Sequence, residues 1–596
     1  MSVEQLITTH LDIWTAADTE KKSGRGRSSG NAGSVYGIKK LRELILELAV
    51  RGKLVPQDES DESASELLKR IAAEKAKLIA EGKIKKDKSL LPSIDDNEKP
   101  FELPQGWACS FLGDAVEIIR GITFPGSEKT KTPEKGRIAC LRTTNVQDQI
   151  EWDDLLYIRE QFVSREDQIL MPRDIVMSMA NSRELVGKVA LVGEEIQQKT
   201  SFGGFLGVLR PFLIEPRFIM ALLRTPYIRN DLIDSASQTT NIANISLAKL
   251  KPLFFAIPPL AEQLRIVAKV DGLMTLCDQL ENQHNNAAEA HDKLVTHLLG
   301  SLTQSQNAED FNSNWLRISE HFDTLFTTEA SIDALKQTLL QLAVIGKLVP
   351  QDPNDEPASE LLKRIQAEKA KLIAEGKIKK DKPLAPITDE DKPFELPQGW
   401  QWLRLGSALD ITGGVTLGRK LTGTDLVELP YLRVANVQRG HLNLDSIKTL
   451  EIRQSELSRY QLLKDDLLVT EGGDWDKVGR TATWNAEIEF CLHQNHIFRM
   501  RNLIKGLSCA WIEMYMNSIA KAYFQAASKQ TTNLASINMT QLKNCLLAIP
   551  ALEEQHRIVA KVDELMATCD QLKSRLTAAN QLQQKLADVI IEQAVN

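Results

Sequence analysis

The sequence lacks the residue patterns that a self-sufficient enzyme would need. A phosphate-binding loop requires G-x-x-x-x-G-K-[ST], and the stretch GGDWDKVGRT at residues 472–481 has no Lys-Ser/Thr pair to hold phosphate and Mg²⁺. An amino-methyltransferase needs [ND]-P-P-[YF] to hold its target nitrogen, whereas residues 257–260 are IPPL. The carboxylates near Asp389 are typical of a solvated loop rather than of a nuclease. The nine histidines and seven cysteines show no zinc-ligand spacing and no recognisable nucleophile pair. We therefore predict that the chain alone is not an enzyme.

Residues suited to the recognition of nucleic-acid bases occur in turn-rich stretches of the sequence. In the major groove, arginine pairs with guanine, asparagine or glutamine with adenine, and acidic side chains with cytosine. Loops commonly carry function, so we select such residues as candidate DNA contacts. The alternative for each is an ordinary hydrogen-bonded surface group. The candidates are Arg142, Asn145, Gln147, Asn181, Arg183 and Lys188 in the first half of the chain, and Arg433, Asn436, Gln438, Asp474, Lys477, Arg480 and His493 in the second.

The tetrapeptide QTTN occurs once in each half of the chain. Its hydroxyl and amide side chains can bind phosphates and fix the position of a protein on DNA without distinguishing sequences. Its presence in both halves fits such a shared task. The residues are Gln238, Thr239, Thr240 and Asn241 in the first copy, and Gln530, Thr531, Thr532 and Asn533 in the second.

These candidates lie within an internal repeat that divides the chain into two halves of nearly equal length. The segment ASELLKRIAAEKAKLIAEGKIKKDK at residues 64–88 recurs at residues 358–382 with one change, Ala72 to Gln366. KPFELPQGW ends at Trp107 and again at Trp400. The separation between copies changes only from 294 residues at Ser65/Ser359 to 292 at Gln238/Gln530. The halves therefore have a common architecture.

The stretches between the repeated blocks are much less alike. Residues 107–255 and 400–547 have similar lengths but little identity, although short matches such as LRTTNVQ and LRVANVQ occur at corresponding places. Short β-branched runs broken by glycine, asparagine and proline predict strands and turns in both. We interpret them as two mixed α/β modules with one fold and different ligands.

The repeated blocks are predicted to be helical, with two long helices that pack on each other. The block after each module has the 3-4 spacing of a coiled-coil seam. The alternative is two separate core helices. The seam residues are Ile266, Val270, Leu273, Cys277 and Leu280 in the first copy, continuing to Leu294 and Leu298, and Ile558, Val562, Leu565, Cys569 and Leu572 in the second, continuing to Leu586 and Ile590.

Composition favours an intracellular protein of several domains. The chain has 596 residues, too many for one core, with 42% apolar and 26% charged residues. Its formal charge of −7 argues against a protein that coats nucleic acid by bulk charge. No apolar run is long enough to span a bilayer, the first residues do not resemble a signal peptide, and the cysteines include no CxxC pair. We expect a cytoplasmic protein.

The repeated motifs together resemble the specificity subunits of type I restriction-modification systems. The resemblance rests on the LPQGW block that opens each variable region, on the IP(P/A)L.EQ.RIV.KVD.L...CDQL block that closes it, and on the alternation of variable and helical regions. It covers nearly the whole chain. It implies an α+β protein with two target recognition domains and two long helices forming an antiparallel coiled coil, related by a pseudo-twofold internal repeat.

The same resemblance implies a division of labour among partners. This chain would recognise a bipartite site on double-stranded DNA, one half per recognition domain, and would dock two modification subunits and, through them, the restriction subunits. S-adenosylmethionine would be bound by the modification subunits, and ATP and Mg²⁺ by the restriction subunits, so this chain would itself hold no cofactor and no metal. The alternatives that remain open are a non-catalytic coiled-coil scaffold and a DNA-recognition subunit of a different restriction class.

These observations divide the chain into five predicted regions. They are residues 1–106, a helical region with a flexible linker at 21–36; 107–255, the first recognition domain; 256–399, a central region whose long helix spans 260–305; 400–547, the second recognition domain; and 548–596, the second long helix.

Overall fold

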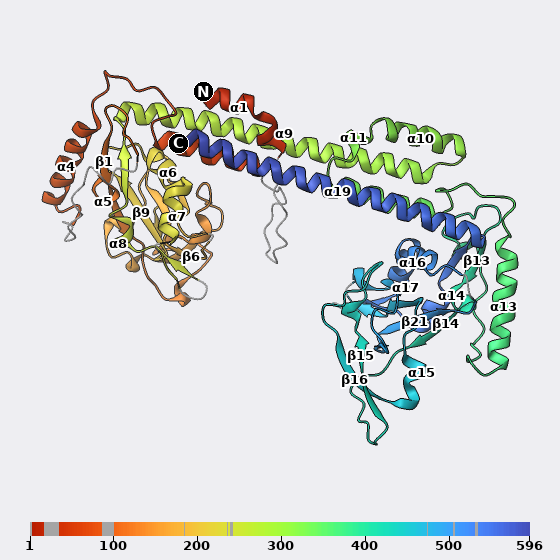
Figure 1. The fold of residues 1–596 in the computed structure, drawn as a ribbon. Helices are drawn as coiled ribbons and strands as arrows, with labels where there is room; N and C mark the ends of the chain where they lie inside the picture. Colours follow the sequence, from red (N-terminus) through yellow and green to blue (C-terminus); the bar gives the residue numbers. More distant parts are fainter. Residues whose placement is uncertain are drawn as a thin grey trace. The chain divides into compact units, whose positions relative to one another are not determined.

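The chain forms two compact units, each built from a mixed α/β module and a group of helices. The computed structural model describes residues 3–16, 35–85, 101–183, 185–234, 236–238, 242–473, 475–504, 507–530 and 535–595 (Figure 1). Residues 1–288 and 578–596 make the first unit, and residues 289–577 make the second. Most of the predicted linker at 21–36 lies outside the described residues.

The first unit contains the helices that precede the first module, the module itself and parts of both long helices. The helices before the module are α1 (Val3–Thr9), α2 (Leu11–Ala16), α3 (Tyr36–Val50) and α4 (Ala64–Ala80). The module comprises β1 (Ala108–Phe111), α5 (Leu112–Ala115), β2 (Val116–Arg120), β3 (Arg137–Leu141), β4 (Leu156–Arg159), β5 (Ile175–Ser178), β6 (Ala180–Asn181), β7 (Val189–Leu191), β8 (Thr200–Phe202), β9 (Leu206–Pro211), α6 (Pro216–Arg224), α7 (Pro226–Asp234), β10 (Ser237–Gln238), β11 (Ala243–Asn244), α8 (Leu247–Leu250) and β12 (Phe254–Ile257).

The second unit repeats this order of elements. The long helix α9 (Leu260–Gln304) leads into α10 (Ala308–Glu320), α11 (Phe322–Leu325), α12 (Glu329–Val344) and α13 (Ala358–Ala374). The second module comprises β13 (Gln401–Arg404), α14 (Leu405–Ala408), β14 (Leu409–Gly413), β15 (Leu426–Leu432), β16 (Lys448–Arg453), α15 (Leu457–Tyr460), β17 (Asp466–Thr470), β18 (Gly472–Gly473), β19 (Thr481–Trp484), β20 (Leu492–His493), β21 (Ile497–Asn502), α16 (Cys509–Asn517), α17 (Ile519–Ala527), β22 (Lys529–Gln530), β23 (Ala535–Ser536), α18 (Met539–Asn544) and β24 (Leu546–Ile549), and the helix α19 (Leu552–Val595) follows.

Strand pairing is the same in both modules. Each has a four-stranded antiparallel sheet, β2-β9-β5-β7 in the first and β14-β21-β17-β19 in the second. A three-stranded sheet with one parallel pair accompanies it, β4-β3-β8 and β16-β15-β20. The first and last strands of each module also pair with each other, with Ala108 opposite Ile257 and Gln401 opposite Ile549. The chain therefore enters and leaves each module at one place.

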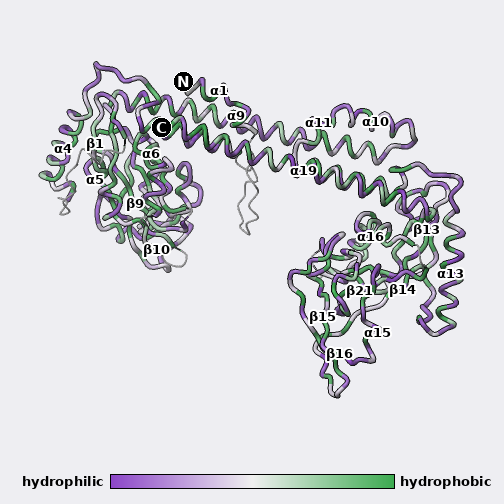
Figure 2. The backbone as a smooth tube through the Cα atoms, in the orientation of Figure 1, coloured by the Kyte–Doolittle hydropathy of each residue, from purple (hydrophilic) through white to green (hydrophobic). Residues whose placement is uncertain are grey.

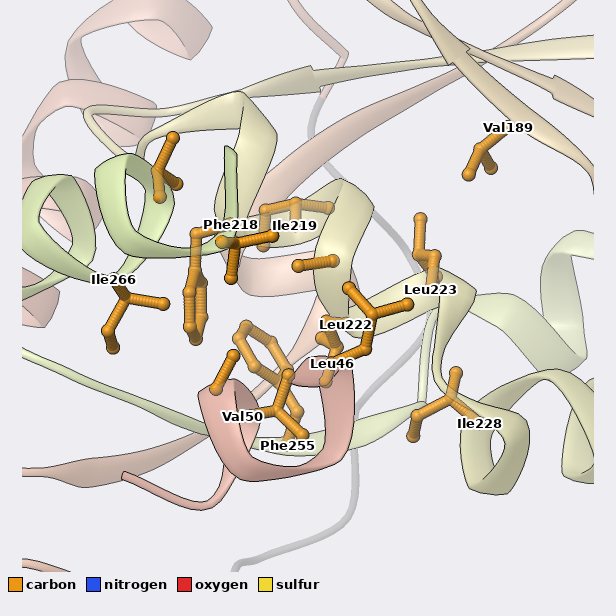
Figure 3. Packing of buried hydrophobic residues seen from close by; sticks show 14 of the residues in the cluster. Leu46, Val50, Val189, Phe218, Ile219, Leu222, Leu223, Ile228, Phe255 and Ile266 are labelled. Carbon is orange, nitrogen blue, oxygen red and sulfur yellow. The ribbon is translucent and has the colours of Figure 1, made fainter. Parts of the chain in front are cut away.

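The core of the first unit forms where the module meets the helices. Figure 3 shows Leu46 and Val50 of α3 close to Phe218 and Leu222 of α6, with Ile266 of α9 beside them. All five side chains belong to one buried cluster. Burial of each such side chain stabilises the fold by about 2 kcal/mol, so this cluster fixes the module on its helices.

A buried carboxylate joins each module to its long helix. Glu262, near the start of α9, is 1% exposed and accepts hydrogen bonds from Trp107 Nε1 at 3.0 Å and Gln57 Nε2 at 3.2 Å. The second unit repeats this arrangement at the same distances with Glu554, Trp400 and Gln351. The three residues come from three repeated motifs, LVPQ (residues 54–57 and 348–351), LPQGW and the EQ of the closing block, so the repeated motifs meet at one point.

Both long helices pack with a third helix within each unit. In the first unit, Tyr36 of α3 donates a hydrogen bond to Asp588 of α19, and Arg42 pairs with Asp278 and Glu281 of α9. In the second unit, Lys336 and Asp333 of α12 pair with Asp570 and Lys573 of α19. Along both long helices hydrophobic and hydrophilic residues alternate (Figure 2).

The residues of the predicted seam are buried near the start of each long helix, and the buried positions shift further along. Ile266, Cys277, Ile558 and Cys569 are buried, as are Val270, Leu273 and Val562, and Leu280, Leu565 and Leu572 are partly buried. The prediction was wrong for Leu294 and Leu586, which are 49% and 42% exposed. Val295, Leu299 and Leu302 are buried instead. An α-helix drifts from a strict seven-residue repeat, and the polar stretch that precedes Leu294 allows the buried face to rotate by one residue.

Substitution of Gly52 tests how tightly the repeated blocks pack. Gly52 ends α3 with φ +69°, and a Cβ there would lie 2.5 Å from Pro104 Cγ and 3.0 Å from the Trp107 ring. Gly82 has nearly the same φ, +71°, with nothing within 4 Å. We expect Gly82→Ala to lower the free energy of unfolding by about 1 kcal/mol, through backbone strain alone.

Gly52→Ala adds the steric clash, so we expect it to cost about 1–3 kcal/mol more than Gly82→Ala. Chemical unfolding of the full chain measures both variants. The corresponding pair in the second unit, Gly346 and Gly376, has the same geometry and provides an independent repeat. Equal losses from Gly52→Ala and Gly82→Ala would contradict the tight packing.

Candidate nucleic-acid interface

A small three-stranded sheet positions the QTTN segment in each module. In the first module β10 pairs with β11, and β11 pairs with β6, so that Asn181 lies opposite Ala243. In the second module β22, β23 and β18 pair in the same way. Thr239, Thr240, Asn241, Thr531, Thr532, Asn533 and Asp474 lie outside the described residues, as do the side chains of Gln238 and Gln530. The fold thus brings Asn181 next to the hairpin that carries QTTN.

In each module two candidate residues form a hydrogen bond with each other, and the two pairs occupy corresponding positions. Lys188 Nζ donates a hydrogen bond to Gln147 Oε1 at 2.8 Å in the first module. In the second, Arg480 Nη1 donates to Gln438 Oε1 at 2.5 Å. All four side chains are half-buried. The glutamine is the same in both modules, but its basic partner is a lysine in the first and an arginine in the second. The two corresponding sites therefore present different hydrogen-bond donors.

The Arg-Asn pair that follows each central strand stabilises a turn, and a DNA contact by the partly exposed Arg142 and Arg433 stays a prediction. Asn145 is 2% exposed, accepts a hydrogen bond from the backbone of Arg142 and donates to the carbonyls of Glu151 and Asp154. Arg142 itself pairs with Asp154 at 2.6 Å. Since all hydrogen bonds of the Asn145 amide point into the protein, our prediction of a DNA contact by Asn145 was wrong.

The second module contains the same turn, with the same correction. Asn436 is 3% exposed, accepts from the backbone of Arg433 and donates to the carbonyls of Asn443 and Ser446. Arg433 donates to the Ser446 carbonyl at 2.8 Å. Asn436 therefore belongs to the turn and not to an interface.

His493 is also an interior residue, and its prediction as a DNA contact was wrong. Its side chain is 0% exposed, and Nδ1 lies 3.0 Å from the Ile497 carbonyl. Burial lowers the pKa of His493 to about 4, so the ring is neutral near pH 7. His493 lies opposite Leu432 in the parallel strand pair of the second module. The corresponding position of the first module is occupied by Phe202, which lies opposite Leu141.

The remaining candidates are accessible to a ligand. Arg183 is exposed and pairs with exposed Asp234 at 2.8 Å, an ion pair that a phosphate could replace at small cost. Asn181 and Lys477 are half-buried. Their contact with DNA stays a prediction.

Side chains that could bind a metal ion do not cluster within the described residues. Among them, no three histidine, cysteine, aspartate or glutamate side chains are placed to hold a metal ion. The seven cysteines are free, and burial raises the pKa of Cys140 and Cys491 to about 12, so neither is a nucleophile at neutral pH. The described helices are all too short or too polar to span a bilayer.

Several residues beside the QTTN hairpin are not among the candidates predicted from the sequence. Exposed Arg120 and Phe205 line a hollow of about 120 Å³ in the first module, together with Ala180 of β6 and Asn244 of β11. His496 occupies the place of Phe205 in the second module. Aligning the stretches FGGF and HQNH between the two halves would have identified both positions.

A comparison with protein families decides the identity of the modules. Residues 104–290 and 397–581 match the family of type I restriction modification DNA specificity domains, which together is more than half of the chain. The chain belongs to this family. The two matched regions contain the two modules described above, so this specificity subunit has two recognition domains.

Curated relatives support the assignment over the full length. The specificity subunit is 42% identical to the type I restriction enzyme EcoAI specificity subunit and 39% identical to the EcoEI specificity subunit, both of Escherichia coli, with complete coverage of each chain. A solved structure described as showing complex assembly and conformational transition of the type I R-M system aligns with 83% of this chain and 99% of its own, with TM-score 0.48 and 19% identity.

The burial of His493 predicts a pH-dependent stability of the specificity subunit. Because the pKa of His493 in the folded protein is below the ordinary value of 6.5, the unfolded chain binds a proton first as the pH falls. Its contribution to stability is therefore present above pH 6.5 and is lost as the pH falls toward 4. At pH 5.5 we expect a loss of about 1.4 kcal/mol relative to pH 7.5.

His493→Phe, which copies Phe202 of the first module, should remove this part of the pH dependence. Calorimetry of the full chain at pH 7.5 and 5.5 measures the difference, with wild type as the control. An unchanged pH dependence in the variant would show that His493 is not the titrating group.

Proposed function

We propose that this specificity subunit recognises a split site on double-stranded DNA, one half per module, without catalytic activity of its own. The carrying observation is that the two modules share one backbone arrangement while the side chains near the QTTN hairpins differ. Lys188 is replaced by Arg480, and Phe205 by His496, at matching positions. Two modules with the same backbone arrangement but different side chains are suited to two different half-sites.

Phosphate contacts and base contacts are divided between two sets of residues in this proposal. The QTTN segments, alike in both modules, bind phosphates and set the position of each module on the duplex. Asn181, Arg183 and Lys188 contact bases in the first half-site. Lys477 and Arg480 do so in the second, while Gln147 and Gln438, alike in both modules, position their basic partners Lys188 and Arg480. Asn145, Asn436 and His493 are excluded because they are buried.

The duplicated helix supports the docking of two copies of one partner. Lys69, Arg70 and Lys77 of α4 are exposed, and so are their counterparts in α13 (Lys363, Arg364 and Lys371). Packing requires only the apolar residues that the helices bury, such as Leu67 and Leu361. Identity on the solvent face therefore favours two identical partners, which we propose to be modification subunits that carry S-adenosylmethionine and flip the target adenine. Restriction subunits, with ATP and Mg²⁺, join through them.

The long helices set the distance between half-sites in this proposal. α9 has 45 residues and α19 has 44, which is about 66 Å of helix each. Half-sites about one turn of DNA apart, roughly 34–36 Å, lie on one face of the duplex. We propose that the two helices form one antiparallel coiled coil about a pseudo-twofold axis.

Exchange of one module tests the assignment of half-sites. Replacing residues 108–257 by an unrelated recognition module exchanges β1 and β12 together, so that the closing strand pair is kept. We expect methylation mapping in cells that co-express the neighbouring modification subunit to show a split adenine-methylation motif. Only one half of that motif should change in the chimera. An unchanged motif, or no motif with the wild-type chain, would favour a scaffold without DNA recognition.

Shortening both long helices tests the spacing role. Deleting residues 282–288 and 574–580 removes one heptad from the middle of each helix and shortens it by about 10 Å. At 3.4 Å per base pair we expect the spacer to become about three base pairs shorter, with both half-sites unchanged. Altered half-site sequences with the original spacer would contradict this role.

A further inference from the structure

One exposed side chain in each module lies beside the QTTN hairpin at an equivalent backbone position. The carbonyl of Phe205 accepts hydrogen bonds from the backbone N–H groups of Met179 at 2.9 Å and Ala180 at 3.2 Å. The carbonyl of His496 accepts from Glu471 N at 2.9 Å. Met179 and Glu471 correspond, since the carbonyl of each accepts a hydrogen bond from the residue directly after the last hairpin strand, Ile245 N after β11 and Ile537 N after β23.

The first module presents an apolar group at this position. Phe205 is 64% exposed, and exposed Ile242 follows the QTTN segment on the adjacent hairpin. Its loop is held closely, because a Cβ at Gly121 would lie only 2.1 Å from the Gly203 carbonyl oxygen. A Cβ at Gly204 would lie 3.0 Å from Thr123 Oγ1. The aromatic ring therefore projects from a fixed backbone toward solvent.

The second module presents a hydrogen-bonding group from the same frame. His496 Nδ1 lies 2.6 Å from Glu471 Oε2, and the two side chains are 59% and 29% exposed. A Cβ at Gly414 would lie 2.1 Å from the His493 carbonyl oxygen, which repeats the close approach seen at Gly121. With Nδ1 at the carboxylate, the imidazole keeps Nε2 for another partner.

The difference between the modules indicates what faces this position. A partner that docks twice would meet the same residues in both units, as on α4 and α13. The position of Phe205 and His496 instead changes from apolar to polar, together with Met179 and Glu471 beneath it. The ligand must therefore differ between the modules, and in the proposed function only the DNA half-sites differ.

We propose that Phe205 and His496 are specificity-determining residues, and that Phe205 packs against the 5-methyl group of a thymine in the first half-site. Phenylalanine can distinguish thymine only through that methyl group, because it offers no hydrogen bond to a base edge. His496, oriented by Glu471, hydrogen-bonds a base edge in the second half-site. This inference rests on the proposed DNA-binding function.

Replacement of thymine by uracil isolates the methyl contact. The complex of the full chain with its modification subunit is first used to map the methylated motif, and the module exchange assigns its halves. Each thymine of the first half-site is then replaced singly by uracil, and binding is measured by competition. We expect one uracil to weaken wild-type binding about three- to fivefold, the effect of one buried methyl group.

Variants of Phe205 decide whether this residue makes the contact. Phe205→Ala should bind the thymine duplex more weakly and should lose all sensitivity to the uracil, whereas Phe205→Leu should keep part of it. Tyr227→Ala is the matched control, since Tyr227 is an equally exposed aromatic residue, at 63%, on α7 of the same module. It should behave like wild type. His496→Ala should relax one base position in the second half-site and leave the first unchanged.

Several outcomes would overturn the inference. They are a first half-site without thymine on either strand, a wild-type complex indifferent to every uracil, or a Phe205→Ala variant that keeps the full uracil effect. Equal thermal midpoints for Phe205→Ala and wild type verify that the variant is folded. A wild-type complex that yields no methylation motif would instead refute the proposed function, so the two failures are distinguishable.

Discussion

The buried carboxylate at the start of each long helix is the interaction on which the rest of the molecule depends. Glu262 and Glu554 each accept a hydrogen bond from the tryptophan that begins a module and from the glutamine that ends the preceding helical block. Burial raises the pKa of both carboxyl groups, so the two donors are needed to hold the charged form. Because three segments far apart in sequence meet at one residue, the long helix, the module and the segment that precedes the duplicated helix are fixed together.

Much of this architecture could be predicted from the sequence because the chain contains an internal repeat. Repetition identifies blocks without any knowledge of their contacts, and the apolar 3-4 spacing predicted the long helices and the first part of their buried face. The later part of that face could not be predicted. The choice between Leu294 and Val295 depends on how far the helix rotates against its neighbours, and two adjacent apolar residues leave that rotation open.

The candidate interface was predicted less well, for a physical reason that the repeat itself reveals. Asn145 and Asn436 belong to the matching LRTTNVQ and LRVANVQ stretches, and a residue kept in both modules cannot distinguish two different half-sites. Such residues serve the shared fold, here as a hydrogen-bonded turn. Polar type alone cannot separate these residues from interface residues. His493 is excluded from the interface by its burial. That burial follows from a strand pairing that no local sequence pattern predicts.

The first unit combines residues from the beginning and from the end of the chain, which affects how the chain folds during synthesis. Its hydrophobic cluster includes Ala587 of α19, with Ile590, Ile591, Ala594 and Val595 packed against it, whereas all its other residues precede position 289. A ribosome releases residues 289–577 before it releases 578–595, so the second unit has all of its residues while the first still lacks one helix segment. The part of the molecule made first is completed last. Until then the growing chain displays part of the apolar surface of this cluster, which residues 578–595 of α19 later cover.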